Sequence, residues 1–317
     1  IAITSQSYLE NGVYKRMKFN IIIPFRPCSK GGASAPSVEF WQNENGEWND
    51  PGDAKWNTPT AGYRNSGFYK PCAKYGDGDE LKLAIKYLNK NSAYKHNIIV
   101  VTDADVHFHK NYPKEYDNVT LLNAEPSPHR LSTALLHGVH YVPDDEWIFY
   151  SYVSDLICPK NWDVPIVQAI EKYGEKYVYA PEFTEVHSSF SGVGVLKGLE
   201  PTPSNIWNTW RKNYLLLMPA PNKDYFTEDD MDYFIKRANE ANKGIIIEKP
   251  GVREYGYYTV FILKAKYGKA ALRRCGGDGC DAFDLDFDNR LDSVCGLQKA
   301  VVTNSFIFHQ FYPFKEE

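Results

Sequence analysis

Four short apolar runs, each stopped by proline or a polar residue, constrain the fold of this chain more than any other sequence feature. They occupy residues 19–23, 97–102, 147–153 and 177–180 and contain no charged residue. Runs of this length are typical of strands that are buried on both faces of a parallel sheet. We therefore predict four buried strands.

A helical pattern lies between the second and third runs, after a polar segment at residues 125–128. Strand, helix and strand in alternation indicate βαβ units with right-handed crossovers. The sequence thus predicts an α/β fold in which helices flank a mostly parallel central sheet. The small and apolar residues that recur at the spacing of one helix face are Leu131, Ala134, Leu135, Gly138 and Val142.

Two segments do not share this pattern. Residues 30–74 mix glycine, proline, asparagine and aromatic residues without a clear period, which indicates a long irregular insertion. Residues 1–16 precede Met17 and carry little apolar periodicity. We interpret them as a tag or a loosely attached arm.

Size and composition favour a large folded domain and give no general electrostatic attraction to polyanions. The 317 residues are 43% hydrophobic, enough for a substantial core, and the net charge is only -4. No run approaches the roughly 18 apolar residues of a membrane-spanning helix. The N-terminus also lacks the zones of a secretory signal. We expect a soluble, cytoplasmic protein.

Acidic side chains follow the second predicted strand, at the edge where open α/β sheets bind ligands. Asp103 and Asp105 come directly after residues 97–102. Their carboxylates can accept hydrogen bonds from the imide of a uracil or from ribose hydroxyls. They can equally bond their own backbone in a turn or cap a helix. Both interpretations stay open.

Asp155 and His309 each follow an apolar run and could contact a metal ion. A carboxylate at the end of the third strand can bind Mg²⁺ or Mn²⁺, which would bridge the phosphates of a nucleoside diphosphate. Strand-end aspartates also start turns. His309 could be a late metal ligand or a phosphate contact, or a side chain satisfied within the core.

Four acids, Glu228, Asp229, Asp230 and Asp232, open a predicted helix. Thr227 with Asp230 resembles a capping box, and acids in a first turn complement the helix dipole. That interpretation accounts for one or two of the acids. Like charges within about one turn are costly, which favours a functional role for the group. The apolar stripe of this helix is Met231, Phe234, Ile235 and Ala238.

Taken in order, these segments resemble the inverting GT-A glycosyltransferases of family 2. In that family an opening strand ends near a proline, as residues 21–24 do, and a second strand ends in a base-binding aspartate, as at Asp103. A helix of small residues then precedes an Asp-x-Asp metal motif, as residues 130–141 precede residues 153–155. A Glu-Asp pair starts a helix that runs to a glycine, as in residues 229–244.

The resemblance implies roles for individual residues. Val153 replaces the first aspartate of the metal motif, so Asp155 is the implied direct ligand of Mn²⁺ or Mg²⁺, together with His309. Asp230 is the implied general base, with Asp229 beside it, and transfer is expected to invert the anomeric carbon. The residues implied in donor binding are Pro24, Arg26, Asp103, Asp105, Arg130 and Ser154.

The resemblance covers roughly residues 18–250 and suggests a division of labour. Residues 17–160 would form the nucleotide-sugar-binding half, and residues 161–317 the acceptor-binding half of the same GT-A domain. A UDP-sugar is the favoured donor. The acceptor is open among a glycan, a protein and a modified nucleic acid.

Two other functions compete with glycosyl transfer. A sugar-phosphate nucleotidyltransferase also combines a nucleotide-binding sheet with metal-binding carboxylates, and Lys30 to Gly32 would be a thin version of its phosphate loop. The missing aspartate at Val153 is compatible with a noncatalytic nucleotide- or glycan-binding module.

Overall fold

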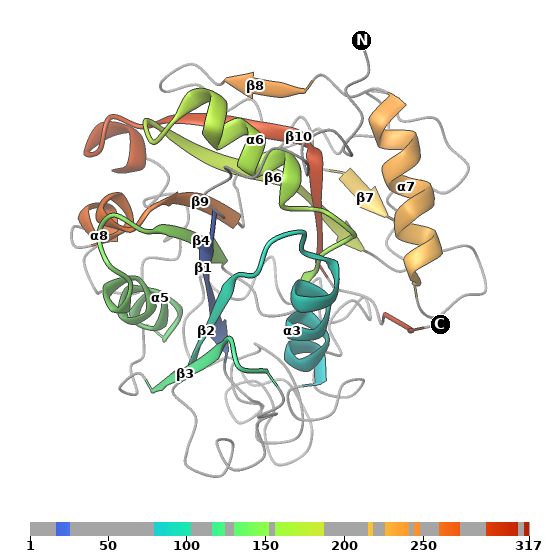
Figure 1. The fold of residues 1–317 in the computed structure, drawn as a ribbon, viewed down its shortest axis with the longest axis horizontal. Coiled ribbons are helices and arrows are strands. Elements are labelled where there is room, and N and C mark those ends of the chain that lie inside the picture. Colours follow the sequence, from blue (N-terminus) through green and yellow to red (C-terminus); the bar gives the residue numbers. More distant parts are fainter. Residues whose placement is uncertain are drawn as a thin grey trace, which may run out of the picture.

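One sheet of ten strands forms the centre of the molecule (Figure 1). A computed structural model of the chain describes residues 17–25, 79–102, 116–123, 130–151, 156–186, 215–217, 226–240, 244–247, 260–272, 290–309 and 314–316. All statements below concern these residues.

The strands follow the order β3-β2-β1-β4-β9-β6-β10-β5, while β7 pairs with β6 and β8 pairs with β10. Strands β5, β8 and β9 run antiparallel to their neighbours, and the other pairs are parallel. Their bounds are β1 Phe19–Phe25, β2 Asn97–Thr102, β3 Val119–Asn123, β4 Trp147–Ser151, β5 Leu156–Ile157, β6 Tyr177–Val186, β7 Leu215–Leu217, β8 Ile245–Ile247, β9 Val260–Lys264 and β10 Gln298–His309.

Helices cover both faces of this sheet. Alternate side chains of β1 point to opposite faces: Ile21 and Ile23 join the core under α3 and α6, and Ile22 joins the core under α5 and α8. Figure 1 shows α5 and α8 side by side. The helices are α3 Asp79–Asn91, α5 Arg130–Tyr141, α6 Val164–Tyr173, α7 Glu228–Glu240 and α8 Ala265–Leu272. This is the mixed α/β architecture, with helices flanking a mostly parallel central sheet, that the sequence predicts.

The predicted strands exist, with shifted ends. Strand β1 continues through Pro24, which pairs with Val101 of β2. The ladder between β1 and β4 ends at Ile22, so the missing N–H of Pro24 is tolerated on that side of the strand. Strand β4 ends at Ser151, two residues early. Strand β6 runs on past Ala180 for a further six residues. Strands from both proposed halves share the one sheet, and the functional division at residue 160 stays a prediction.

A third apolar cluster holds α7 against the carboxyl half of β10. Phe234 of α7 makes edge-to-face contacts with Phe306 and Phe308. Phe226, just before the helix, forms a bridge with Phe314 near the end of the chain. Helix α7 is therefore fixed beside the end of β10.

Gly138 permits the close approach of α5 to the sheet. A Cβ atom at this position would lie 2.5 Å from Ile22 Cγ2 and 2.9 Å from Val101 Cγ2, and both of those side chains are fully buried. Real Cβ atoms do not approach other heavy atoms this closely. The small residue is therefore required by packing.

The Gly138→Ala variant tests this contact. We expect the free energy of unfolding to fall by about 1–3 kcal/mol, because the core has no space for the methyl group. His137→Ala, at an exposed site on the same helix, is the matched control and should change little. Urea denaturation measures both, and equal stability of the two variants would contradict the close packing.

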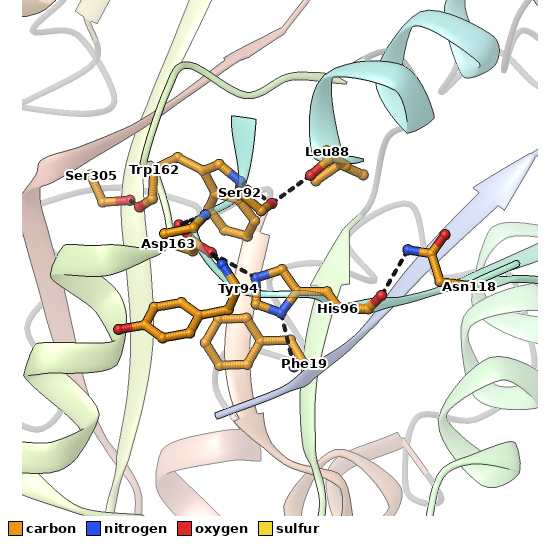
Figure 2. Close-up of polar contacts among 10 residues, drawn as sticks. Phe19, Leu88, Ser92, Tyr94, His96, Asn118, Trp162, Asp163 and Ser305 are labelled. Atoms are coloured by element: carbon orange, nitrogen blue, oxygen red, sulfur yellow. Dashed lines mark hydrogen bonds and ion pairs between the residues drawn. The ribbon is translucent and has the colours of Figure 1, made fainter. Parts of the chain in front are cut away.

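A buried carboxylate ties together the amino ends of the central strands (Figure 2). Asp163 is fully buried and accepts hydrogen bonds from the backbone N–H of Ala93 (2.9 Å), the backbone N–H of Tyr94 (3.0 Å) and His96 Nε2 (2.9 Å). His96 Nδ1 accepts from the backbone N–H of Phe19 at 3.2 Å. Because Nδ1 accepts this hydrogen bond, Nε2 is the ring nitrogen that carries the hydrogen and donates it to Asp163.

Polar neighbours extend this network in three directions. Trp162 Nε1 donates to Ser92 Oγ at 2.9 Å, and the Trp162 carbonyl accepts from Ser305 Oγ of β10 at 2.6 Å. Asn118 donates to the His96 carbonyl at 2.8 Å. The network thus joins β1, the connection before β2, the start of α6, and β10 (Figure 2).

Removal of the central carboxylate should be strongly destabilising. Asp163→Ala leaves two part-buried backbone N–H groups and the buried His96 without their acceptor, and we expect a loss of about 3–5 kcal/mol in the free energy of unfolding. Asp117→Ala removes a carboxylate from an exposed ion pair with Lys95 and should have little effect. Chemical denaturation measures both. A loss no larger than that of the control would show that the network does not hold the fold together.

Candidate functional site at the carboxyl edge of the sheet

The sheet changes its direction of winding at β1. The chain passes from β1 to β2 with α3 on one face, and from β3 to β4, on the other side of β1, with α5 on the opposite face. In open α/β sheets, ligands bind in the crevice at such a switch point, beyond the carboxyl ends of the strands. The carboxyl ends of β1 and β4 therefore define the candidate site.

The sequence-predicted metal residues flank a short antiparallel ladder at this edge. Strand β5 follows β4 after four residues, and Leu156 of β5 pairs with His309, the last residue of β10. Leu156 is the residue that follows Asp155 in the sequence. The fold thus brings His309 from the far end of the chain to the residue next to Asp155.

The predicted donor-binding residues are partly within the described structure. Pro24 is the second-last residue of β1, and Arg130 is the first residue of α5. Both are at the ends of elements that border the switch point. The predicted residues that lie outside the described part of the chain are Arg26, Asp103, Asp105, Ser154 and Asp155.

The predicted capping box at the start of α7 is confirmed. Asp230 Oδ2 accepts from the backbone N–H and the hydroxyl of Thr227, each at 3.1 Å, and Thr227 Oγ1 accepts from the backbone N–H of Asp230 at 3.4 Å. Asp230 is fully buried, whereas Asp229 is exposed. A carboxylate in this position must leave the capping box before it can touch a substrate. The catalytic roles of both residues stay predictions.

Glu228 also has structural partners. Its Oε1 accepts from Tyr87 Oη and from Lys90 Nζ of α3, each at 2.5 Å. Burial acts to raise the pKa of Glu228, but the hydrogen bonds from Lys90 and Tyr87 outweigh it and hold the pKa below its ordinary value. Asp232 has its pKa raised by partial burial and by the charges of Glu228 and Asp229. Contacts within the fold therefore account for much of the acidic cluster at the start of α7.

A carboxyl group that the sequence analysis missed lies on β6. Glu182 is partly exposed, and burial alone raises its pKa from 4.5 to about 8. Within the described part of the chain, no hydrogen bond or ion pair compensates its carboxyl group. The signal was an acid close behind the apolar run at residues 177–180, but the predicted strand ended before it, at Ala180.

This environment predicts an unusual pH dependence of stability. The folded state holds the Glu182 proton up to about pH 8, whereas the unfolded chain releases it near pH 4.5. The contribution of this proton to the stability of the folded state is therefore complete below pH 4.5 and is lost as pH rises through 8. Glu182→Gln should therefore gain stability over the wild type between about pH 5 and about pH 9. The gain is at most several kcal/mol, and solvent near the partly exposed side chain reduces it.

Urea denaturation across this pH range measures the gain. Glu171→Gln, on the exposed side of α6, is the matched control and should track the wild type. Parallel pH profiles for the wild type and Glu182→Gln would contradict the raised pKa.

Two further searches of the described residues concern metals and membranes. No three His, Cys, Asp or Glu side chains of the described ranges gather into a metal-binding group. None of the helices that the structure describes is both long enough and apolar enough to cross a membrane.

Comparisons with known proteins include a distant structural likeness. No family model matches the sequence, and no curated protein matches it. The chain is similar to the solved structure titled "Crystal structure of GalNAc-T7 with UDP, GalNAc and Mn2+", with 12% identity and a TM-score of 0.40. The match covers 73% of this chain and 40% of that chain, so this chain spans less than half the length of that one. The likeness says nothing about individual residues of the site.

Proposed function

We propose that this chain is a glycosyltransferase that moves a sugar from a nucleoside diphosphate sugar to an acceptor hydroxyl with the help of a divalent metal ion. The observation that carries the proposal is the β5–β10 ladder, which pairs His309 with the residue after Asp155. The ladder brings the chain positions of His309 and of the residue after Asp155 together, and we propose that their side chains face one ligand. The ladder lies at the carboxyl edge of the sheet, the edge on which the switch point between β1 and β4 also lies.

The donor nucleotide is proposed to bind over β1 and β2. Asp103 and Asp105 follow β2, whose last residue, Thr102, pairs with Phe25 at the end of β1. Their carboxylates suit the base and the ribose. UDP is the favoured nucleotide. The remaining residues proposed on the donor side are Pro24, Arg26, Arg130 and Ser154.

Asp155 and His309 are proposed to hold Mn²⁺ or Mg²⁺. One carboxylate and one imidazole form an oxygen and nitrogen donor set, which suits Mn²⁺ better than Mg²⁺, with phosphate oxygens and water as the other ligands. Such an ion neutralises charge on a departing diphosphate. The fit rests on ligand chemistry and on the ladder.

The acceptor is proposed to approach from the side of α7. This helix packs on the carboxyl half of β10 through Phe234, which places its first turn beside the second half of the sheet. Asp229 is exposed in that turn and is available to a substrate, whereas Asp230 is held in the capping box. An attack from this side, opposite a metal-bound diphosphate, would invert the anomeric carbon. A glycan, a protein or a modified nucleic acid could supply the hydroxyl.

Calorimetric titration with a panel of nucleoside diphosphates, with and without Mn²⁺, tests the proposal. We expect UDP to bind only with Mn²⁺, and Asp155→Ala and His309→Ala each to weaken that binding by about 10-fold or more, since each variant removes a metal ligand. Asp145→Ala, an exposed acid before the amino end of β4, is the control. Failure of every nucleotide to bind the wild type would refute the glycosyltransferase proposal.

A further inference from the structure

Glu182 lies level with the carboxyl end of β4. Tyr179 of β6 pairs with Ile262 of β9 in antiparallel register. Continuing that register by two residues sets Pro181 opposite Val260, where β9 begins, so Glu182 lies one residue beyond the start of β9. Val260 in turn pairs with Ser151, the last residue of β4. With β9 between them, β6 and β4 are about 10 Å apart.

The surroundings of this carboxyl group are apolar. In the β6–β10 ladder Glu182 pairs with Phe306, so their side chains lie on the same face of the sheet. Among its neighbours in the described part of the chain, Val260 of β9 and Phe306 of β10 are buried and apolar, and neither is ionisable. Burial is accordingly the sole cause of its raised pKa.

An uncompensated carboxyl group is expensive inside a protein, and such groups concentrate at functional sites. The residue as a whole is partly exposed although its carboxyl group is desolvated, so it lies at the boundary between the core and the surface. It lies at the edge that the switch point defines, two strands from the residues that lead to Asp155. These three observations distinguish Glu182 from Asp230, whose carboxylate is fully buried and already bonded to Thr227.

We propose that Glu182 accepts the proton of the acceptor hydroxyl during sugar transfer. The inference rests on the proposed function and names a catalytic residue for it. The acceptor O–H bond breaks and its proton moves to the Glu182 carboxylate, while the acceptor oxygen bonds to the anomeric carbon. The bond from that carbon to the diphosphate breaks, and its electron pair leaves with the nucleoside diphosphate.

The acidity of the group suits this step. A general base works best when its pKa lies near the working pH, because it is then both ionised and a strong acceptor. With a pKa of about 8, Glu182 becomes ionised as pH rises through that value, so the rate should rise with it. An ordinary glutamate would be fully ionised far below this range, so the pH–rate profile would have no rising limb near pH 8.

The test is release of UDP from a panel of UDP-hexoses with Mn²⁺, where water serves as the acceptor, from about pH 6 to about pH 9.5. For the intact chain we expect kcat/KM to rise through about pH 8. Glu182→Gln should lower it by about 100-fold or more and abolish the limb. Glu182→Asp, which keeps an ionisable group, should retain a limb at a reduced rate. Glu171→Gln, on the exposed side of α6, is the matched control and should keep both the rate and its rise with pH.

Titration of UDP and Mn²⁺ into each variant separates the two proposals. Glu182→Gln should bind UDP within about 3-fold of the wild type, because the residue acts on the acceptor and not on the nucleotide. Failure of the wild type to bind any nucleotide would refute the proposed function itself. Intact binding with an unchanged pH profile in Glu182→Gln, or intact binding with no UDP release from the wild type, would overturn the role of Glu182 alone.

Discussion

The fold depends on one buried negative charge, the carboxylate of Asp163, and on the three donors that surround it. Two backbone N–H groups and the His96 imidazole satisfy its oxygens. His96 in turn is oriented by the N–H of Phe19 at the start of β1. A buried charge is tolerable only with such partners. The arrangement fixes the amino ends of the central strands, so the carboxyl ends are held in a defined position for chemistry.

Glu182 is the opposite case, and the contrast is informative. Asp163 and Glu182 carry the same chemical group, but the first has three donors and the second has none in the described structure. The first lies near the amino edge of the sheet and the second near the carboxyl edge. Proteins retain an uncompensated group where it serves a ligand more often than where it serves the core. The carboxyl group that stabilises the fold and the one proposed to react thus lie at opposite edges of the sheet.

The acids at the start of α7 show why charge clustering is an ambiguous signal. Four acids within about one turn favoured a functional site, because like charges repel. The structure gives Asp230 a capping role, and it gives Glu228 two partners on α3, Tyr87 and Lys90. Those partners lie some 140 residues earlier in the chain. No local pattern could have revealed them, whereas the capping box was visible because its two residues lie only three positions apart.

Local signals in the sequence therefore determined the α/β class, the central strands, helix α5, and the Thr227–Asp230 cap, because apolar periodicity and capping act over a few residues. Only the tertiary structure decided which distant residues meet. The pairing of Leu156 with His309 and the placing of Glu182 beside Phe306 both follow from β10, a strand formed at the far end of the chain. Strand pairing is set by nonlocal packing and register, and a single sequence does not encode those in any local pattern.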